Sequence, residues 1–135
     1  MNLEDEKFRF KFNQMKKGAN YYFFQILDDS LFLVVDELSK FENVTDEMIY
    51  TCLYALINSI KIYNYEKSSG YSKFVSDYIH LTLLIARENK IMPNQIYEIM
   101  LPNNDVILEE EYVEECFNKI KDELKSVPKK EFLYK

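Results

Sequence analysis

The sequence is poor in the residues that interrupt regular secondary structure and in those that build catalytic and metal sites. Among its 135 residues there are two glycines, three prolines, two cysteines, one histidine and no tryptophan. So little glycine and proline leaves few positions for turns, and this argues against long loops. The two isolated glycines also exclude the glycine-rich loops that cradle phosphates in nucleotide-binding proteins. The sequence therefore indicates a globular domain without a nucleotide-binding fingerprint.

The histidine and the cysteines are too scattered for a readable catalytic or metal site. Cys52 and Cys116 lack the C-x-x-C spacing of redox and zinc motifs. Each falls in an apolar helical stripe, where a thiol is usually an inert core side chain. His80 follows Asp77 by three residues, so the two share a helix face as a candidate acid–base or metal pair, but a zinc site needs further ligands. We expect no metal, no cofactor and a structural or surface role for His80.

Long hydrophobic runs are also absent. The longest uncharged stretch, residues 48–60, has 13 residues, whereas a helix that crosses a bilayer needs about 20. The N-terminus is acidic and lacks the basic and apolar regions of a signal peptide. We expect no membrane association and a cytoplasmic location. The abundance of residues with A/T-rich codons, such as lysine, asparagine and isoleucine, indicates a bacterial or phage gene.

The charge balance is negative, because 23 acidic residues face 17 basic ones and the net charge is −6. An acidic protein repels the phosphate backbone, so this balance counts against a general nucleic-acid binder. It suits a basic protein partner, and it also keeps a protein soluble without any partner. The length and the 47% hydrophobic content are those of one globular domain. We expect a single helical domain over residues 1–135, with a loose tail from about residue 128.

The N-terminal third carries mixed signals. Residues 3–17 favour a helix, although alternating phenylalanines there also fit a strand. Residues 21–41 fit a helix with one continuous apolar face, while the aromatic and β-branched runs within 21–35 also fit a minor β-hairpin. We favour the helix in both segments and keep the hairpin as the alternative for 21–35. The helix predicts that four acidic side chains are exposed, namely Asp28, Asp29, Asp36 and Glu37.

The remaining sequence shows clearer helical signals. Thr45 is a typical N-cap, Ser72 is a candidate cap, and Pro93 suits the first turn of a short helix. The last helix has glutamates near its start and lysines towards its end, as the helix dipole favours. These signals predict an all-α fold, a compact array of five or six helices. The expected helices of this part cover about residues 45–63, 72–90, 93–101 and 108–126.

An acidic cluster at the start of the last helix is the first candidate binding site. It consists of Glu110, Glu111, Glu114 and Glu115. Like charges four residues apart oppose each other by a few tenths of a kcal/mol, roughly, and that cost is consistent with a role in binding. The helix dipole also explains the cluster without any partner. We select these four glutamates as partner-binding candidates.

Three tyrosines around the loop at 64–70 form the second candidate. They are Tyr63, Tyr65 and Tyr71. Tyrosine is favoured at binding surfaces because it buries a large area at a small entropic cost and keeps a polar tip. Codon usage alone also supplies many tyrosines, which is the simpler explanation.

Residues 81–101 resemble a helix–turn–helix in their apolar spacing. DNA recognition requires polar and basic side chains on the second helix, and Glu98 is the only charged residue between Pro93 and Pro102. The apolar positions that carry the spacing are Ile85, Ala86, Ile91, Ile96 and Ile99.

Taken together, the sequence favours a non-enzymatic protein-interaction module. The leading hypothesis is an acidic inhibitor- or immunity-type protein that binds and masks a basic protein partner. The alternatives are a helical regulatory domain that uses residues 81–101, and an enzyme without a readable motif, in which Asp77 and His80 would be tested first. A homo-oligomer is compatible with each of these.

Overall fold

The computed structural model describes residues 21–63, 70–100, 110–128 and 132–134, and this part of the chain contains five helices and no strand. The predicted all-α fold class is therefore confirmed. Among the helices described, none combines the length and the apolar character that crossing a membrane requires. The predicted helix at 3–17 lies outside the described residues. The five helices are α2 (Tyr21–Leu38), α3 (Asp46–Tyr63), α4 (Tyr71–Glu88), α5 (Pro93–Met100) and α6 (Glu110–Ser126).

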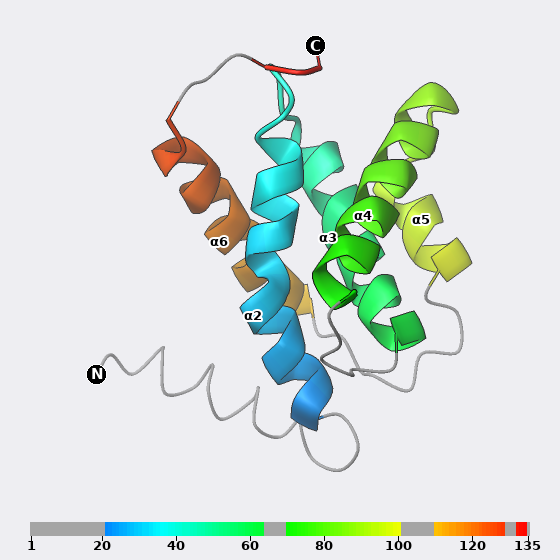
Figure 1. Cartoon of the computed structure of the whole chain (residues 1–135). Helices are drawn as coiled ribbons and strands as arrows, with labels where there is room; N and C mark the ends of the chain where they lie inside the picture. The colour runs from blue at the N-terminus through cyan, green and yellow to red at the C-terminus, as the bar shows by residue number, and fades with distance from the viewer. Residues whose placement is uncertain (1–20, 64–69, 101–109, 129–131, 135) are drawn as a thin grey trace.

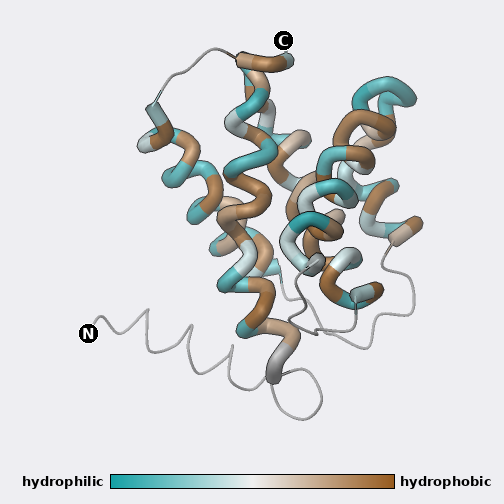
Figure 2. The backbone as a smooth tube through the Cα atoms, in the orientation of Figure 1, coloured by the Kyte–Doolittle hydropathy of each residue, from teal (hydrophilic) through white to brown (hydrophobic). Residues whose placement is uncertain are grey.

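Helix α3 lies at the centre and packs against α2, α4, α5 and α6 (Figure 1). A helix with neighbours on several sides must be apolar over most of its circumference, which explains why the 48–60 stretch has no charged residue. The flanking helices are amphipathic, and Figure 2 shows hydrophobic and hydrophilic residues alternating along α2, α4 and α6. The buried residues of α3 are Met48, Ile49, Thr51, Cys52, Leu53, Ala55, Leu56, Ile57, Ser59 and Ile60.

Helix α2 is continuous, so the hairpin alternative for residues 21–35 is excluded. Its three- and four-residue apolar steps bring Leu27, Val34 and Leu38 onto one fully buried face. Three of the four acidic residues predicted to be exposed are exposed. The prediction for Glu37 is wrong, because this side chain is buried.

The last helix follows its sequence pattern closely. Helix α6 packs against α2 and α3 through its apolar residues, which recur at helical spacing. Its glutamates are exposed on the opposite face, as the pattern predicts, and so are Lys119 and Lys125. The buried residues are Tyr112, Val113, Cys116, Phe117 and Ile120.

The helix ends test the predicted caps. The Thr45 hydroxyl accepts a hydrogen bond from the Met48 amide at 3.3 Å, so the predicted N-cap of α3 is confirmed. Pro93 is the first residue of α5, as predicted. Helix α4 starts at Tyr71 with Gly70 as its N-cap and no side-chain cap. The prediction that Ser72 caps α4 is wrong, because the chain is already helical there.

The described end of the chain is held against the C-terminal end of α2. The Leu133 and Tyr134 amides donate to the Lys40 carbonyl at 3.0 and 2.9 Å, and the Glu42 amide donates to the Tyr134 carbonyl at 2.8 Å. The Tyr134 ring stacks on Phe41, with centroids 4.9 Å apart. Residues 132–134 are therefore bonded to 40–42, whereas the sequence suggested a loose tail from about residue 128.

Helix α4 ends in a Schellman motif at Lys90. The Ile91 amide donates to the Ala86 carbonyl at 2.8 Å and the Lys90 amide to the Arg87 carbonyl at 3.4 Å. Lys90 has a φ of 55°, and it is the only non-glycine residue with a positive φ in the described part of the chain. Glycine is preferred at this position because a Cβ atom is strained in the left-handed region.

We expect Lys90→Gly to raise the free energy of unfolding by about 0.5–1 kcal/mol, since relief of the strained φ outweighs the greater freedom of glycine in the unfolded chain. Urea unfolding followed by circular dichroism measures the change. The matched control is Asn89→Gly, which should destabilise the protein, because Asn89 has a negative φ of −98° and its side-chain amide donates to the Ile85 carbonyl. Equal destabilisation by both substitutions would show that the left-handed conformation of Lys90 is not strained.

Candidate functional site

The predicted acidic cluster lies in the first two turns of α6, and all four of its glutamates are exposed. Glu114 is positioned by a contact that joins α6 to α3. The Tyr50 hydroxyl donates a hydrogen bond to the Glu114 carboxylate. Because a carboxylate accepts several hydrogen bonds, Glu114 keeps capacity for a further donor.

Tyr50 belongs to a row of four aromatic rings that crosses three helices. Its ring stacks on Phe117 of α6, with centroids 4.5 Å apart and an interplanar angle of 13°. On its other side the row continues to Tyr54, at 6.3 Å, and then to Tyr97 of α5, at 5.3 Å from Tyr54. Phe117 is buried, Tyr50 and Tyr54 are half-buried, and Tyr97 is 37% exposed. We call these four residues the aromatic row.

The acidic cluster acts electrostatically on the aromatic row. Burial, followed by the hydrogen bond to Glu114, raises the pKa of Tyr50 above its usual range. Burial also raises the pKa of Tyr54, and the charges of Glu114 and Glu110 add to this effect. A cation already contacts the far end of the row, where the Lys121 ammonium lies 5.4 Å from the Phe117 ring centroid.

Sequence reasoning missed the aromatic row. Tyr50 and Tyr54 are spaced four residues apart, which places them on one face of α3, and this was the available signal. Nothing in the sequence indicated that Tyr97 of α5 and Phe117 of α6 would extend that face, because these residues meet only in the tertiary structure.

The structure brings together two of the three predicted loop tyrosines. Tyr63 and Tyr71 are in edge-to-face contact at 5.6 Å, and the Tyr71 hydroxyl shares a hydrogen bond of 2.8 Å with the buried Ser30 hydroxyl. The Tyr63 ring also packs against Phe74 at 5.0 Å. These contacts join α2, α3 and α4 and give both tyrosines a packing role. Tyr65 lies outside the described residues.

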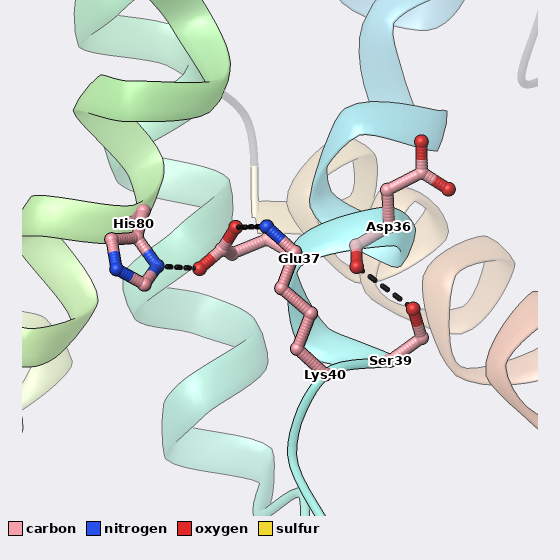
Figure 3. A network of polar contacts seen from close by, with 5 residues as sticks. All are labelled: Asp36, Glu37, Ser39, Lys40 and His80. Atoms are coloured by element: carbon pink, nitrogen blue, oxygen red, sulfur yellow. Dashed lines mark hydrogen bonds and ion pairs between the residues drawn. The ribbon is translucent and has the colours of Figure 1, made fainter. Parts of the chain in front are cut away.

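A buried carboxylate is the most unusual polar feature of the described structure. The Glu37 side chain is 1% exposed and binds two cationic or potentially cationic groups (Figure 3). One carboxylate oxygen contacts Nδ1 of His80, and the other accepts from the Lys40 ammonium at 2.9 Å. Because a buried unpaired charge is strongly unfavourable, these partners explain how Glu37 is tolerated inside the protein.

The acidic neighbour of Glu37 explains why Glu37 was predicted to be exposed, and its position on α2 explains why it is buried. Its neighbour Asp36 is exposed, and two adjacent acidic residues normally mark a solvent face. Glu37 is three residues after Val34 and four residues before Phe41, both of which are buried, so it lies on the buried face. There it faces α4, which supplies His80, and the His80 ring lies 5.7 Å from the Tyr134 ring.

The predicted Asp77–His80 pair has separate partners in the structure. Asp77 forms an exposed ion pair with Lys73 at 2.9 Å, whereas His80 binds Glu37. Within the described ranges, no three histidine, cysteine, aspartate or glutamate side chains are grouped so that they could hold a metal ion.

Both cysteines are buried and free. Burial, together with the nearby Glu37 charge, raises the pKa of Cys52. Burial is also the main cause that raises the pKa of Cys116 from 9.0 to about 12. Such thiols stay protonated near neutral pH, so neither is a ready nucleophile.

An open groove of about 370 Å³ lies between the start of α3 and the end of α4. Its lining includes the buried side chains of Met48 and Leu83 and the exposed Lys90. Neither Glu37 nor His80 lines this groove. Glu47, Arg87 and Lys90 line the groove, so its charged groups are separate from the Glu37–His80 contact.

Comparison with known proteins adds no functional assignment: no family model, no curated protein and no solved structure matches the chain. Any function of this protein must therefore be inferred from the arrangement of its own residues.

We expect Glu37→Ala to lower the free energy of unfolding by about 1.5–3 kcal/mol, because it removes the contacts that the buried carboxylate makes with His80 and Lys40. Denaturant unfolding measures this loss. The matched control is the neighbouring Asp36→Ala, which should change stability by less than about 0.5 kcal/mol because Asp36 is exposed. Similar effects of the two substitutions would show that the Glu37 pairs contribute little.

Cys116 should make stability depend on pH in the alkaline range. The folded thiol keeps its proton up to about pH 12, whereas the unfolded thiol loses it near 9.0, so its contribution is complete below pH 9.0 and is lost as the pH rises towards 12. We expect the free energy of unfolding of Cys116→Ala to fall less steeply over this window, by up to about 1.4 kcal/mol per pH unit. Urea unfolding at several pH values measures both slopes, and parallel slopes would refute this expectation.

Proposed function

We propose that this protein is a non-enzymatic interaction module that binds a basic protein partner, as an acidic inhibitor or immunity-type protein would. The observation that carries the proposal is the presence of exposed carboxylates beside accessible tyrosines on neighbouring helices. Glu114 is bonded to Tyr50, and Tyr54 and Tyr97 continue the aromatic surface. Aromatic anchors beside complementary charges are the usual composition of a protein-binding surface.

The net charge of −6 supports the same proposal. A negative surface attracts a positive partner over long range and raises the association rate, and salt screens this attraction. The tyrosines supply apolar area that salt does not screen. Binding through such a surface should therefore weaken with ionic strength without disappearing.

The two alternatives have less support from the contacts. In the 81–101 segment, Ala86 and Ile96 are buried, whereas Ile85 is 53% exposed and Ile99 is 68% exposed. Only part of the apolar spacing therefore reflects packing. For an enzyme, the strongest feature is the Glu37–His80 contact, because a carboxylate that orients an imidazole is common in catalysis. A duplex gel shift tests the first alternative. Loss of an activity in folded His80→Ala would support the second.

We expect simultaneous reversal of the four cluster glutamates to lysine to weaken capture of a basic partner at least about tenfold, because attraction becomes repulsion. The measurement is a pull-down from lysate of the source cells at low and high salt, followed by titration with the purified partner. The tested substitutions are Glu110→Lys, Glu111→Lys, Glu114→Lys and Glu115→Lys.

The control reverses the same number of exposed acidic residues elsewhere, so that the net charge of the two variants is equal. If both variants bind the partner equally well, net charge governs binding and the α6 surface is not the site. If the partner is not basic, the proposed function fails. The control substitutions are Asp29→Lys, Asp36→Lys, Glu42→Lys and Glu88→Lys.

A further inference from the structure

The open groove between the start of α3 and the end of α4 has a mostly apolar floor. Met48 and Thr51 of α3 and Leu83 and Ala86 of α4 line the groove, and all four residues are buried. Its volume of about 370 Å³ lies within the range of pockets that hold small molecules, about 300–1,000 Å³. A short aliphatic group can therefore pack on this floor away from water.

Thr51 is the polar member of the floor. The residue is 3% exposed, and no hydrogen-bond partner is found for its hydroxyl among the described residues. Ser59, on the same helix, instead donates to the Leu56 carbonyl at 2.7 Å, which is how a buried hydroxyl in a helix is usually satisfied. Because an unpartnered buried hydroxyl is destabilising, Thr51 is available to bond a molecule that occupies the groove.

Lys90 supplies a positive charge at the same groove. Its side chain is exposed and has no ion pair within the part of the chain that the structure describes. With a φ of 55°, its backbone adopts the left-handed conformation that favours glycine. A lysine here places a cation beside the groove at a cost in stability, and strained backbone of this kind is common at binding sites.

Two other charged residues line the groove. The Arg87 guanidinium lies 4.9 Å from the Phe41 ring centroid, and the Glu47 side chain is exposed. With two basic residues and one acidic residue, the lining is positive overall, although the whole protein has a net charge of −6. This local reversal of sign favours a ligand that carries a negative group.

We propose that this groove binds a small molecule that joins a carboxylate to a short aliphatic chain. The Lys90 ammonium pairs with the carboxylate, the floor covers the aliphatic chain, and the Thr51 hydroxyl supplies a hydrogen bond that helps to orient the molecule. Two sources have this chemistry, a simple carboxylic acid and an α-amino acid whose ammonium group Glu47 would attract. None of the acidic-cluster glutamates lines the groove, so this site is independent of the proposed function.

The test is an NMR titration of the full chain with three probes that share one carbon skeleton, namely isocaproate, leucine and the uncharged isocaproamide. We expect isocaproate or leucine to cause saturable shifts of the Met48, Leu83 and Ala86 methyl signals. Isocaproamide should bind at least about tenfold more weakly than the better carboxylate, because it cannot form the ion pair. Tighter binding of leucine, weakened by Glu47→Gln, would identify an amino acid as the source, whereas tighter binding of isocaproate would identify a simple acid.

Substitutions at Lys90 separate binding from folding. Lys90→Gly should weaken carboxylate binding at least about fivefold, because the cation is lost. The same substitution should raise the free energy of unfolding, so loss of the fold cannot explain weaker binding. Lys90→Arg should retain binding, since it keeps the positive charge.

Thr51→Val tests the buried hydroxyl. It should weaken carboxylate binding about threefold or more without lowering stability, because a methyl group of similar size replaces a hydroxyl that has no partner. The matched control is Thr82→Val, which should leave binding unchanged, since Thr82 is also buried but does not line the groove.

Three outcomes would overturn the inference. The first is the absence of saturable shifts at the groove methyl groups with both carboxylates. The second is equal affinity for isocaproamide and isocaproate, which would mean that the groove does not recognise the charge. The third is binding that neither Lys90→Gly nor Thr51→Val weakens, which would place the site elsewhere. None of these outcomes affects the proposed function, which depends on the acidic cluster of α6.

Discussion

The burial of α3 among four other helices is the constraint on which the rest of the structure depends. Its uncharged central stretch is stable only when covered on several sides, and α2, α4, α5 and α6 provide that cover. The same packing decides what the surface carries. The side of α3 that is only half covered presents Tyr50 and Tyr54, and the helices that flank it add Tyr97 and Phe117. The aromatic row is thus a consequence of how the core is closed.

The buried carboxylate complements this apolar core. Glu37 connects α2 to α4 through His80, and the Tyr134 ring, next to His80, brings in the end of the chain. Burying a charge weakens a fold unless its partners are well placed, so such a contact adds to structural specificity more readily than to net stability. We therefore interpret the contacts of Glu37 and His80 as structural, because they determine how α2, α4 and residues 132–134 pack together. Neither Glu37 nor His80 lines the open groove, which agrees with that structural interpretation.

The functional proposal combines two features that are weak when taken singly. Acidic residues at a helix start are favoured by the dipole alone, and tyrosines are common in helical cores. Their combination is more informative, because the Tyr50–Glu114 bond fixes an exposed carboxylate beside the aromatic row. An interface of this kind has one component that acts at long range and one that acts on contact, and the two differ in their response to salt.

The sequence by itself determined the helices, most of their buried faces and the acidic start of α6, since helical periodicity, caps and dipole effects operate within a few residues. Only the tertiary structure decided that Glu37 binds His80, because the two residues are 43 positions apart. It likewise decided that Tyr50 meets Glu114 across 64 residues and that Tyr97 continues the row. A local pattern states which residues share a face of a helix. Which faces then meet depends on the packing of all the helices around α3, and no local pattern encodes that choice.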